Sequence, residues 1–305
     1  MTDKELHQFY EDFVRRLRVQ GVVCAITSGL ACVHFGVAET TKDCDLLCHA
    51  GAFPRLLDEL SALRVGVWAC RYRGNITPPL DVRWHRGGWT SHFHWGDGPD
   101  AVKFDVFGRA LRGTQPWETD LTGLYASPAV VAEMKRTNRD KDWPFITALG
   151  EWLVETGDSR GWLHIFSADS LSRLLRMHRC PADVVGRRPC LQLAIDRDAR
   201  IAGALLAERQ LWVQLDKLRI RIYERTVRPY LVAVRKAQMP DNTPLERQHE
   251  IRLRCAEEHL RESPLIDYGL DRHLAEGRQA TATLVHPETM QWLPDVKEYF
   301  NYLQT

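Results

Sequence analysis

The chain has 305 residues, a length that suits two domains or one domain with a large extension. Apolar residues make up 44% and charged residues 27%, with a formal net charge of +1, which excludes a strongly acidic or basic chain. No run of about 18 apolar residues occurs, so we expect no membrane span. The charged N-terminus lacks the apolar stretch of a signal peptide. Eight cysteines without a Cys-x-x-Cys pair predict reduced thiols in a cytoplasmic protein.

The N-terminal half alternates between helical and β-prone patterns. Apolar residues at helical spacing predict helices over 4–20, 30–36, 53–63, 128–137 and 143–155. Short β-prone runs predict strands over 22–26 and 42–48, and a β-rich region over 65–107 with turns at 73–75, 86–88 and 96–99. Beyond 161 the pattern is mostly helical, above all over 203–238. We therefore expect an α/β (α+β) core with a mixed sheet at 1–156, a linker at 157–161, and a mostly helical domain over 157–305.

Three aspartates on predicted strands form the main candidate site. Asp43 and Asp45 are separated by one residue, so both side chains leave the same face of a strand. Because neighbouring acids repel each other, a half-buried pair favours a bound cation, and oxygen ligands suit Mg²⁺. Asp105 lies in a later run whose alternate apolar residues face the core, which leaves Asp105 on the other side. Asp-x-Asp alone is a common pattern, and Asp81 is an alternative third carboxylate.

The turn before the Asp-x-Asp strand is a second feature. Thr27, Ser28 and Gly29 stand between a predicted strand and a predicted helix. Small residues let backbone N–H groups approach a ligand, and the N-terminus of a helix attracts anionic oxygens. Ser28 and Gly29 are therefore candidate phosphate-binding residues.

The order of these features resembles the nucleotidyltransferase superfamily that includes DNA polymerase beta. Its signature is a Gly-Gly or Gly-Ser turn, a short spacer and Asp-x-Asp, and here thirteen residues separate Gly29 from Asp43. The resemblance implies a nucleotidyltransferase core, an NTP such as ATP as substrate, and Mg²⁺ or Mn²⁺ held by Asp43, Asp45 and Asp105. Two departures, Ser28 where the first Gly is common and Glu39 where Arg is usual, keep a non-catalytic copy as the alternative.

A second resemblance involves residues 133–142. This stretch is similar to the Lys…Arg-x-Lys-Asp helix motif of the AbiEii-type toxin nucleotidyltransferases and their uncharacterised relatives, and residues 41–45 are similar to their Thr-x-Asp-x-Asp strand. The resemblance implies that Lys135 contacts nucleotide phosphate, that Asp142 helps to position it, and that Arg139 belongs to the same nucleotide-binding group. The alternative is a solvated, salt-bridged helix end.

Charge is unevenly distributed in the C-terminal half. Residues 171–236 contain 15 Lys or Arg and 6 Asp or Glu, a net of +9, whereas 237–305 contain 7 basic and 12 acidic residues, a net of −5. A basic helical face beside a nucleotidyltransferase core can hold tRNA or another RNA through its phosphates. The basic segment can equally complement the acidic one within the same molecule.

Two histidines offer another metal site. His92 and His94 are two residues apart in the β-rich region, a spacing that can place both rings on one side of a strand for Zn²⁺. Because no cysteine lies at ligand spacing to support it, a surface or active-site rim position is the more common explanation of such a pair.

The hypothesis from these residues is transfer of a nucleotidyl group from an NTP to a hydroxyl on RNA, a protein or a small molecule. Asp43 and Asp45 would hold two Mg²⁺ ions that neutralise the triphosphate and activate the acceptor hydroxyl, with Asp105 as ligand and base. The alternative is a non-catalytic nucleotidyltransferase-fold binding protein of a toxin–antitoxin or defence system. The sequence leaves the NTP, the acceptor and the oligomeric state open.

Overall fold

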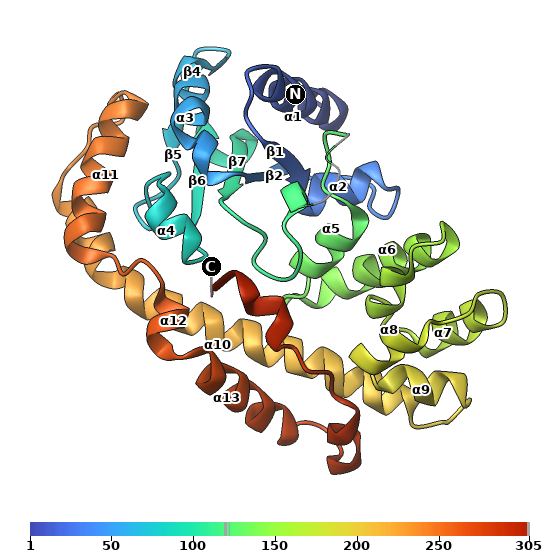
Figure 1. Ribbon diagram of the computed structural model, residues 1–305. Coiled ribbons are helices and arrows are strands. Elements are labelled where there is room, and N and C mark those ends of the chain that lie inside the picture. Colours follow the sequence, from blue (N-terminus) through green and yellow to red (C-terminus); the bar gives the residue numbers. More distant parts are fainter. Residues whose placement is uncertain (119–120, 122, 304–305) are drawn as a thin grey trace. The chain divides into compact units, whose positions relative to one another are not determined.

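The computed structural model describes residues 1–118, 121 and 123–303, and it is α+β with a five-stranded mixed sheet and a helical C-terminal region (Figure 1). The strands are β1 Cys24–Thr27, β2 Asp43–Cys48, β3 Arg64–Val65, β4 Trp68–Ala69, β5 Arg71–Tyr72, β6 Thr90–Trp95 and β7 Val102–Phe107. The α-helices are α1 Asp3–Val19, α2 Ser28–His34, α3 Phe53–Ala62, α4 Val82–Arg86, α5 Pro128–Met134, α6 Trp143–Glu155, α7 Ala168–Leu175, α8 Ala182–Arg187, α9 Cys190–Ile195, α10 Ile201–Lys236, α11 Leu245–His259, α12 Pro264–Tyr268 and α13 Leu270–Ala282. No helix of these described residues is long and apolar enough to span a bilayer.

The chain divides into two compact units, each assembled from two segments. The first comprises Met1–Ala126 and Ile222–Asp267, and the second Ser127–Arg221 and Tyr268–Thr305, so the division falls within α10. The predicted boundary at 156/157 lies inside the second unit instead. The reason is close packing of the expected linker on α6, since a Cβ added at Gly161 would lie 2.4 Å from the carbonyl oxygen of Gly150.

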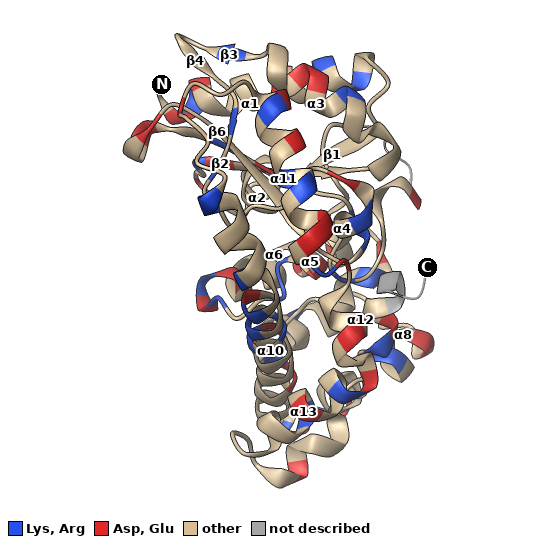
Figure 2. Ribbon diagram, turned by 90° about the vertical axis from the view of Figure 1, so that its left-hand side faces the viewer, with Lys and Arg blue, Asp and Glu red and all other residues tan. Residues whose placement is uncertain are grey.

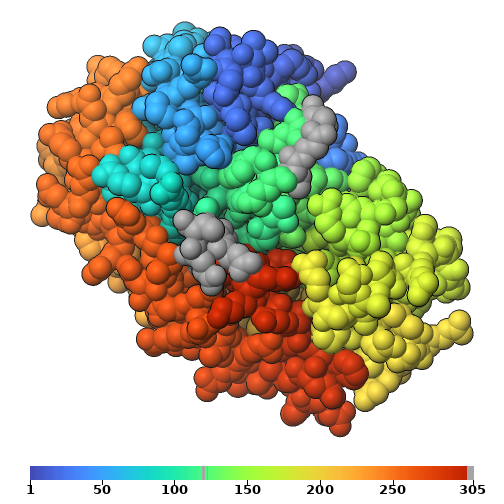
Figure 3. All heavy atoms as spheres, in the orientation of Figure 1, coloured from blue at the N-terminus to red at the C-terminus, as the bar shows by residue number. Residues whose placement is uncertain are grey.

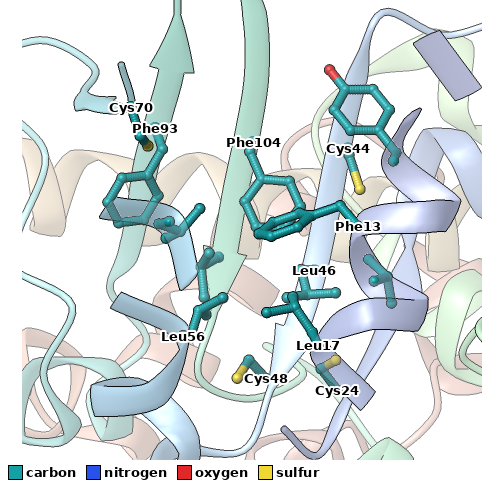
Figure 4. Packing of buried hydrophobic residues seen from close by; sticks show 14 of the residues in the cluster. Phe13, Leu17, Cys24, Cys44, Leu46, Cys48, Leu56, Cys70, Phe93 and Phe104 are labelled. Carbon is teal, nitrogen blue, oxygen red and sulfur yellow. The ribbon is translucent and has the colours of Figure 1, made fainter. Parts of the chain in front are cut away.

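Helix α1 illustrates how local sequence sets the first unit. Thr2 and Glu5 form a capping box, in which Glu5 N donates to Thr2 Oγ1 at 3.3 Å and Thr2 N donates to Glu5 Oε2 at 2.8 Å. The apolar side of α1 packs on the sheet, where the rings of Phe13 and Phe104 lie 5.4 Å apart in an edge-to-face arrangement. Figure 4 shows Phe13 and Leu17 beside Phe104 in this core. One face of the sheet is thereby apolar and covered.

The sheet has the strand order β1-β2-β7-β6-β5, and only the β2–β7 pair is parallel. In β7 the residues alternate as predicted: Phe104 is buried in the core, whereas Lys103 and Asp105 are on the opposite, half-buried face. The Tyr10 hydroxyl joins the two parallel strands, since it lies 3.1 Å from Lys42 O and 2.8 Å from Lys103 O and accepts from Lys103 N at 3.2 Å. Burial raises the pKa of Tyr10, so it remains a protonated hydroxyl.

The C-terminal segment of the first unit covers the sheet edge at β5. The backbone N–H of Tyr72 donates to Gln248 Oε1 of α11 at 3.1 Å, which satisfies an edge-strand donor that would otherwise be unpaired. In Figure 3 the orange surface of α11 lies beside the blue surface of α3, in keeping with the contacts between these helices. Residues more than 170 positions apart therefore complete this side of the sheet.

The region 65–107 is less β-rich than predicted, because it contains α4. Asp81 Oδ1 accepts from Arg83 N at 2.9 Å and caps the first turn of that helix, and its carboxylate also pairs with the Arg83 side chain at 2.9 Å. Asp81 therefore has a local structural role, and the structure gives no support to it as the alternative third carboxylate.

Candidate functional site

The three candidate aspartates lie on one face of the sheet. In the parallel pairing of β2 with β7, Asp45 is opposite Asp105, and Asp43 is opposite Lys103. Residues paired in this way on adjacent strands point to the same side. The pleat of β2 keeps Asp43 and Asp45 on that side and Cys44 in the core.

This polar face continues across β6 to β5. His92 is opposite Asp105 and His94 is opposite Lys103 in the β6–β7 pairing, and Arg71 is opposite His94 in the β5–β6 pairing. Two rows of polar side chains therefore cross the sheet, Arg71–His94–Lys103–Asp43 and His92–Asp105–Asp45–Thr27. The acids are concentrated on β2 and β7, whereas the basic groups extend from β7 to β5.

Asp105 is held by two basic side chains. Arg73 Nη2 donates to Asp105 Oδ1 at 2.7 Å and to Oδ2 at 2.8 Å, and His92 Nδ1 lies 3.0 Å from Oδ2. The Asp105 side chain is 14% exposed, compared with 31% for Arg73. Ion pairs in such a partly buried position are stronger than those at the open surface. Both oxygens of the third carboxylate are thus occupied.

Asp43 has a weaker partner and an unsatisfied oxygen. Lys103 Nζ lies 3.7 Å from Asp43 Oδ1, too far for a hydrogen bond, and this buried oxygen has no hydrogen-bond partner among the described residues. A carboxylate oxygen in this condition is destabilising, and a hard cation would satisfy it. The oxygen donors of Asp43, Asp45 and Asp105 therefore fit Mg²⁺ or Mn²⁺ in their chemistry.

The side chains do not form a ready-made chelate as they stand. Within 1–118, 121 and 123–303, no group of three His, Cys, Asp or Glu side chains is placed to hold a metal ion. In the acidic group, Asp105 is directed to Arg73 instead. His92 and His94 share a strand face, as expected, but His92 contacts Asp105 and His94 is opposite Lys103. The histidine pair therefore belongs to the polar face and does not form a separate zinc centre.

The small turn lies next to the acidic end of this face. Thr27 is opposite Asp45 in the β1–β2 pairing, and α2 begins at Ser28 directly after it. Ser28 has a φ of 58°, in the left-handed region that a residue other than glycine rarely adopts. A Cβ added at Gly29 would lie 2.6 Å from Thr41 Oγ1, so this glycine permits close contact with the segment that leads into β2. Thr27, the N-cap of α2, makes no side-chain capping hydrogen bond.

The residues from the second resemblance lie in the second unit, where they form a buried ion pair. Lys135 Nζ donates to Asp142 Oδ1 at 3.1 Å, and the two side chains are only 7% and 3% exposed. Thr137 Oγ1 donates to Asp142 Oδ2 at 3.2 Å, and the exposed Arg139 places Nε 3.6 Å from the same oxygen. The salt-bridged helix end considered from the sequence is present, with the difference that its central pair is buried. Such a pair is costly to break by removing one partner.

The basic segment is extensively paired within the molecule. Figure 2 shows Lys and Arg along α10, and several arginines of the second unit have carboxylate partners. These pairs include Arg173–Glu151, Arg188–Glu208, Arg200–Asp198, Arg209–Asp140 and Arg219–Asp216. Arg187 Nη2 is 2.6 Å from Glu298 and thereby joins the basic and acidic segments, as the intramolecular alternative predicts.

Sequence reasoning missed Arg73, which it assigned to a turn. Arg73 N donates to His92 O at 2.8 Å, so the β5–β6 pairing extends one residue beyond β5. The following loop is held by Arg252 of α11, which is 2% exposed and donates to Gly74 O at 2.8 Å and to Thr77 O at 2.7 Å. Arginines two residues apart, at 71 and 73, indicate a polar strand face. No local sequence pattern indicates the hydrogen bonds from Arg252 of α11.

A cavity of about 220 Å³ lies at the β5 edge of the polar face. Arg71 and His94, which belong to one of the two rows, contribute to its lining together with Asn75, Asp97 and Arg252. Burial and the neighbouring Arg71 lower the pKa of His94, so the ring favours its neutral form. The cavity therefore presents guanidinium, carboxylate, amide and neutral imidazole groups.

Comparison of the chain with protein-family models, with curated proteins and with solved structures gave no match. We therefore characterise the polar face of the first unit by its geometry.

Proposed function

We propose that the protein is a metal-dependent nucleotidyltransferase that moves a nucleotidyl group from an NTP to a hydroxyl acceptor. The observation that carries this proposal is the common face of Asp43, Asp45 and Asp105, with Asp45 and Asp105 directly opposite each other. Three carboxylates on one face suit divalent cations bound together with phosphates. The resemblance of the turn and the Asp-x-Asp strand to nucleotidyltransferases supports the same reaction class.

In this proposal Asp43 and Asp45 hold the metal ions, and Asp105 is the third ligand. The bound ions supply charge neutralisation for the triphosphate and lower the pKa of the acceptor hydroxyl. Ser28 and Gly29 offer backbone N–H groups to phosphate at the start of α2. Lys135, Arg139 and Asp142 are left out of the phosphate contacts, because Lys135 Nζ is bound to Asp142 inside the second unit.

We place the nucleoside of the NTP in the cavity at the β5 edge. It lies three strands from β2, a distance of about 14 Å at the usual strand spacing. That span is compatible with a triphosphate at the acidic end and a base in the cavity of about 220 Å³. RNA as the acceptor remains part of the proposal, with exposed basic residues of α10 such as Lys217 and Arg221 as candidate contacts.

A cytoplasmic location is part of the same proposal. No disulfide joins the eight cysteines, all of which are among the described residues. Burial raises the pKa of Cys24 to about 12, so this thiol resists ionisation. Reduced, buried thiols are usual in a reducing compartment.

A specific observation also favours the second candidate, a non-catalytic binding protein of a toxin–antitoxin or defence system. Arg73 forms an ion pair with Asp105, the third carboxylate. In a protein that does not bind metal at this site, such a built-in cation would take the place of the metal ion. The two candidates differ in one respect, since only the enzyme must exchange this ion pair for a metal ion.

The test is transfer from radiolabelled NTPs to total RNA and protein with Mg²⁺ or Mn²⁺. The wild type is compared with Asp45→Asn and with a matched control, Asp58→Asn, which changes an exposed acid on α3. We expect transfer in the wild type and the control and none in Asp45→Asn. Absence of both transfer and metal–NTP binding in the wild type would favour the non-catalytic candidate.

A further inference from the structure

Asp105 and Asp43 each lie beside a cation from the protein. Asp105 binds Arg73 at 2.7 Å, and Asp43 lies 3.7 Å from Lys103. The side chains of Arg73 and Lys103 are 31% and 35% exposed, so solvent and ligands can reach them. Arg73 and Lys103 received no role in the sequence analysis. They are therefore adjacent to two carboxylates, Asp105 and Asp43, that it assigned to the metal site.

The charge of this group constrains what can bind. Asp43, Asp45 and Asp105 provide three negative charges and Arg73 and Lys103 two positive ones, a net of −1. A divalent cation alone must compete with Arg73 and Lys103 for the acids and would leave both cations without a carboxylate. A cation that arrives with phosphate avoids this cost, because the phosphate oxygens replace the lost carboxylates.

The hydrogen bonds of Arg73 leave it able to make such an exchange. All of the short polar contacts of its side chain in the described part of the chain involve Nη2, which donates to both oxygens of Asp105 and lies 3.2 Å from His92 Nδ1. The Nε and Nη1 N–H groups therefore remain for another acceptor. A guanidinium presents adjacent N–H groups in a planar fork that matches two phosphate oxygens.

The backbone that carries Arg73 is fixed from the other end of the first unit. Arg252 holds Gly74 O and Thr77 O, and the Tyr230 hydroxyl also donates to Thr77 O at 2.7 Å. A side chain on a fixed backbone can change partner while its Cα stays in place. The guanidinium therefore has a defined reach on the polar face.

We propose that Arg73 and Lys103 form the phosphate-binding half of this site, and that they are exchanged from the aspartates to the nucleotide when a divalent cation binds. The proposal rests on the nucleotidyltransferase function above and adds to it the residues that recognise the triphosphate. In the ligand-free protein, Arg73 and Lys103 neutralise the aspartates as the metal ions would. The aspartates in turn bind these two cations as the phosphate would. Metal and nucleotide thus bind together more favourably than either does alone.

The experiment measures binding of Mn²⁺ alone by electron paramagnetic resonance, and binding of Mn²⁺ with a non-hydrolysable ATP analogue by calorimetry. The variants are Arg73→Gln and Arg73→Lys, with Lys103→Gln as a second site. The control is Arg83→Gln, which removes another partly exposed arginine paired with carboxylates, in α4. Circular dichroism establishes that each variant is folded.

We expect opposite effects in Arg73→Gln. Mn²⁺ alone binds more tightly, because its competitor for Asp105 is gone, whereas Mn²⁺ with the nucleotide binds about tenfold more weakly or worse, because a charge-assisted contact is lost. Arg73→Lys restores part of the nucleotide affinity, since it keeps the charge without the planar fork. Like Arg73→Gln, Lys103→Gln strengthens binding of Mn²⁺ alone and weakens binding of Mn²⁺ with the nucleotide. Arg83→Gln changes neither affinity.

Two results would overturn the proposal in different ways. If Arg73→Gln weakens both affinities together or changes neither, Arg73 is a structural residue, and the proposed function is unaffected. If the wild type binds neither Mn²⁺ nor Mn²⁺ with nucleotide, the proposed function itself fails, and the exchange fails with it.

Discussion

Asp45 and Asp105 are directly opposite each other on the parallel strands β2 and β7, on the half-buried face of the sheet opposite the apolar core. Two carboxylates in this position repel each other. Arg73 compensates by binding both oxygens of Asp105. The same arrangement that requires a cation in the free protein would attract a divalent ion with a nucleotide.

The first prediction concerns Asp43→Asn. Loss of one negative charge from the acidic group relieves repulsion and removes only a weak ion pair, so unfolding free energy without metal should change by less than about 1 kcal/mol. The rise in melting temperature produced by Mg²⁺ with ATP should disappear, because a hard anionic ligand is lost. Thermal melts with and without ligand measure both effects, and Asp58→Asn should retain the ligand-induced rise.

The second prediction uses the backbone of Ser28. Its φ of 58° suits glycine better than serine, so Ser28→Gly should stabilise the protein by about 1 kcal/mol. Ser61→Gly in the last turn of α3 should have the opposite sign, because glycine in a helix lowers stability. Urea unfolding of the two variants tests this, and destabilisation by Ser28→Gly would mean that the serine side chain is needed at the turn.

The third prediction concerns Arg252→Met. The substitution leaves Gly74 O without its buried donor, whereas Thr77 O keeps the Tyr230 hydroxyl, so we expect a loss of about 1–3 kcal/mol. Arg254→Met on the same helix is exposed and should have little effect. Chemical denaturation gives the comparison. Equal losses in the two variants would refute the role of Arg252 in holding the loop that carries Arg73.

The fourth prediction is a pH dependence. Burial lowers the pKa of His85 to about 3, a shift that Asp81 partly opposes and His92 reinforces. In the unfolded chain a histidine titrates near pH 6.5, so below that pH the unfolded state binds the extra proton. The stability that neutral His85 contributes is therefore present above about pH 6.5 and is lost as pH falls towards 3, by about 1.4 kcal/mol per pH unit.

The measurement is unfolding free energy between pH 7 and pH 4. In His85→Gln the slope should be shallower by one proton, whereas His259→Gln, which changes an exposed histidine of the same unit, should keep the wild-type slope. An unchanged slope in His85→Gln would place the acid sensitivity at other buried groups.

Local patterns in the sequence determined much of the first unit. The alternation of Phe104 and Asp105 assigned one residue to the core and one to the opposite face, because a strand has a side-chain period of two. The apolar spacing over 4–20 predicted helix α1 for a similar local reason, since a helix has a period of 3.6 residues. In the second unit, the predicted helix over 143–155 coincides with α6.

Only the tertiary structure decided which residues face the aspartates. The pairing of Asp45 with Asp105 joins strands about sixty residues apart, and Arg73 is positioned by Arg252, a residue 178 positions beyond Gly74. Lys135 and Asp142 read as a charged helix end, yet packing buries them as a pair. The physical reason is that periodicity and caps depend on neighbouring residues, whereas strand register, loop support and burial depend on contacts between distant segments, for which the sequence contains no local pattern.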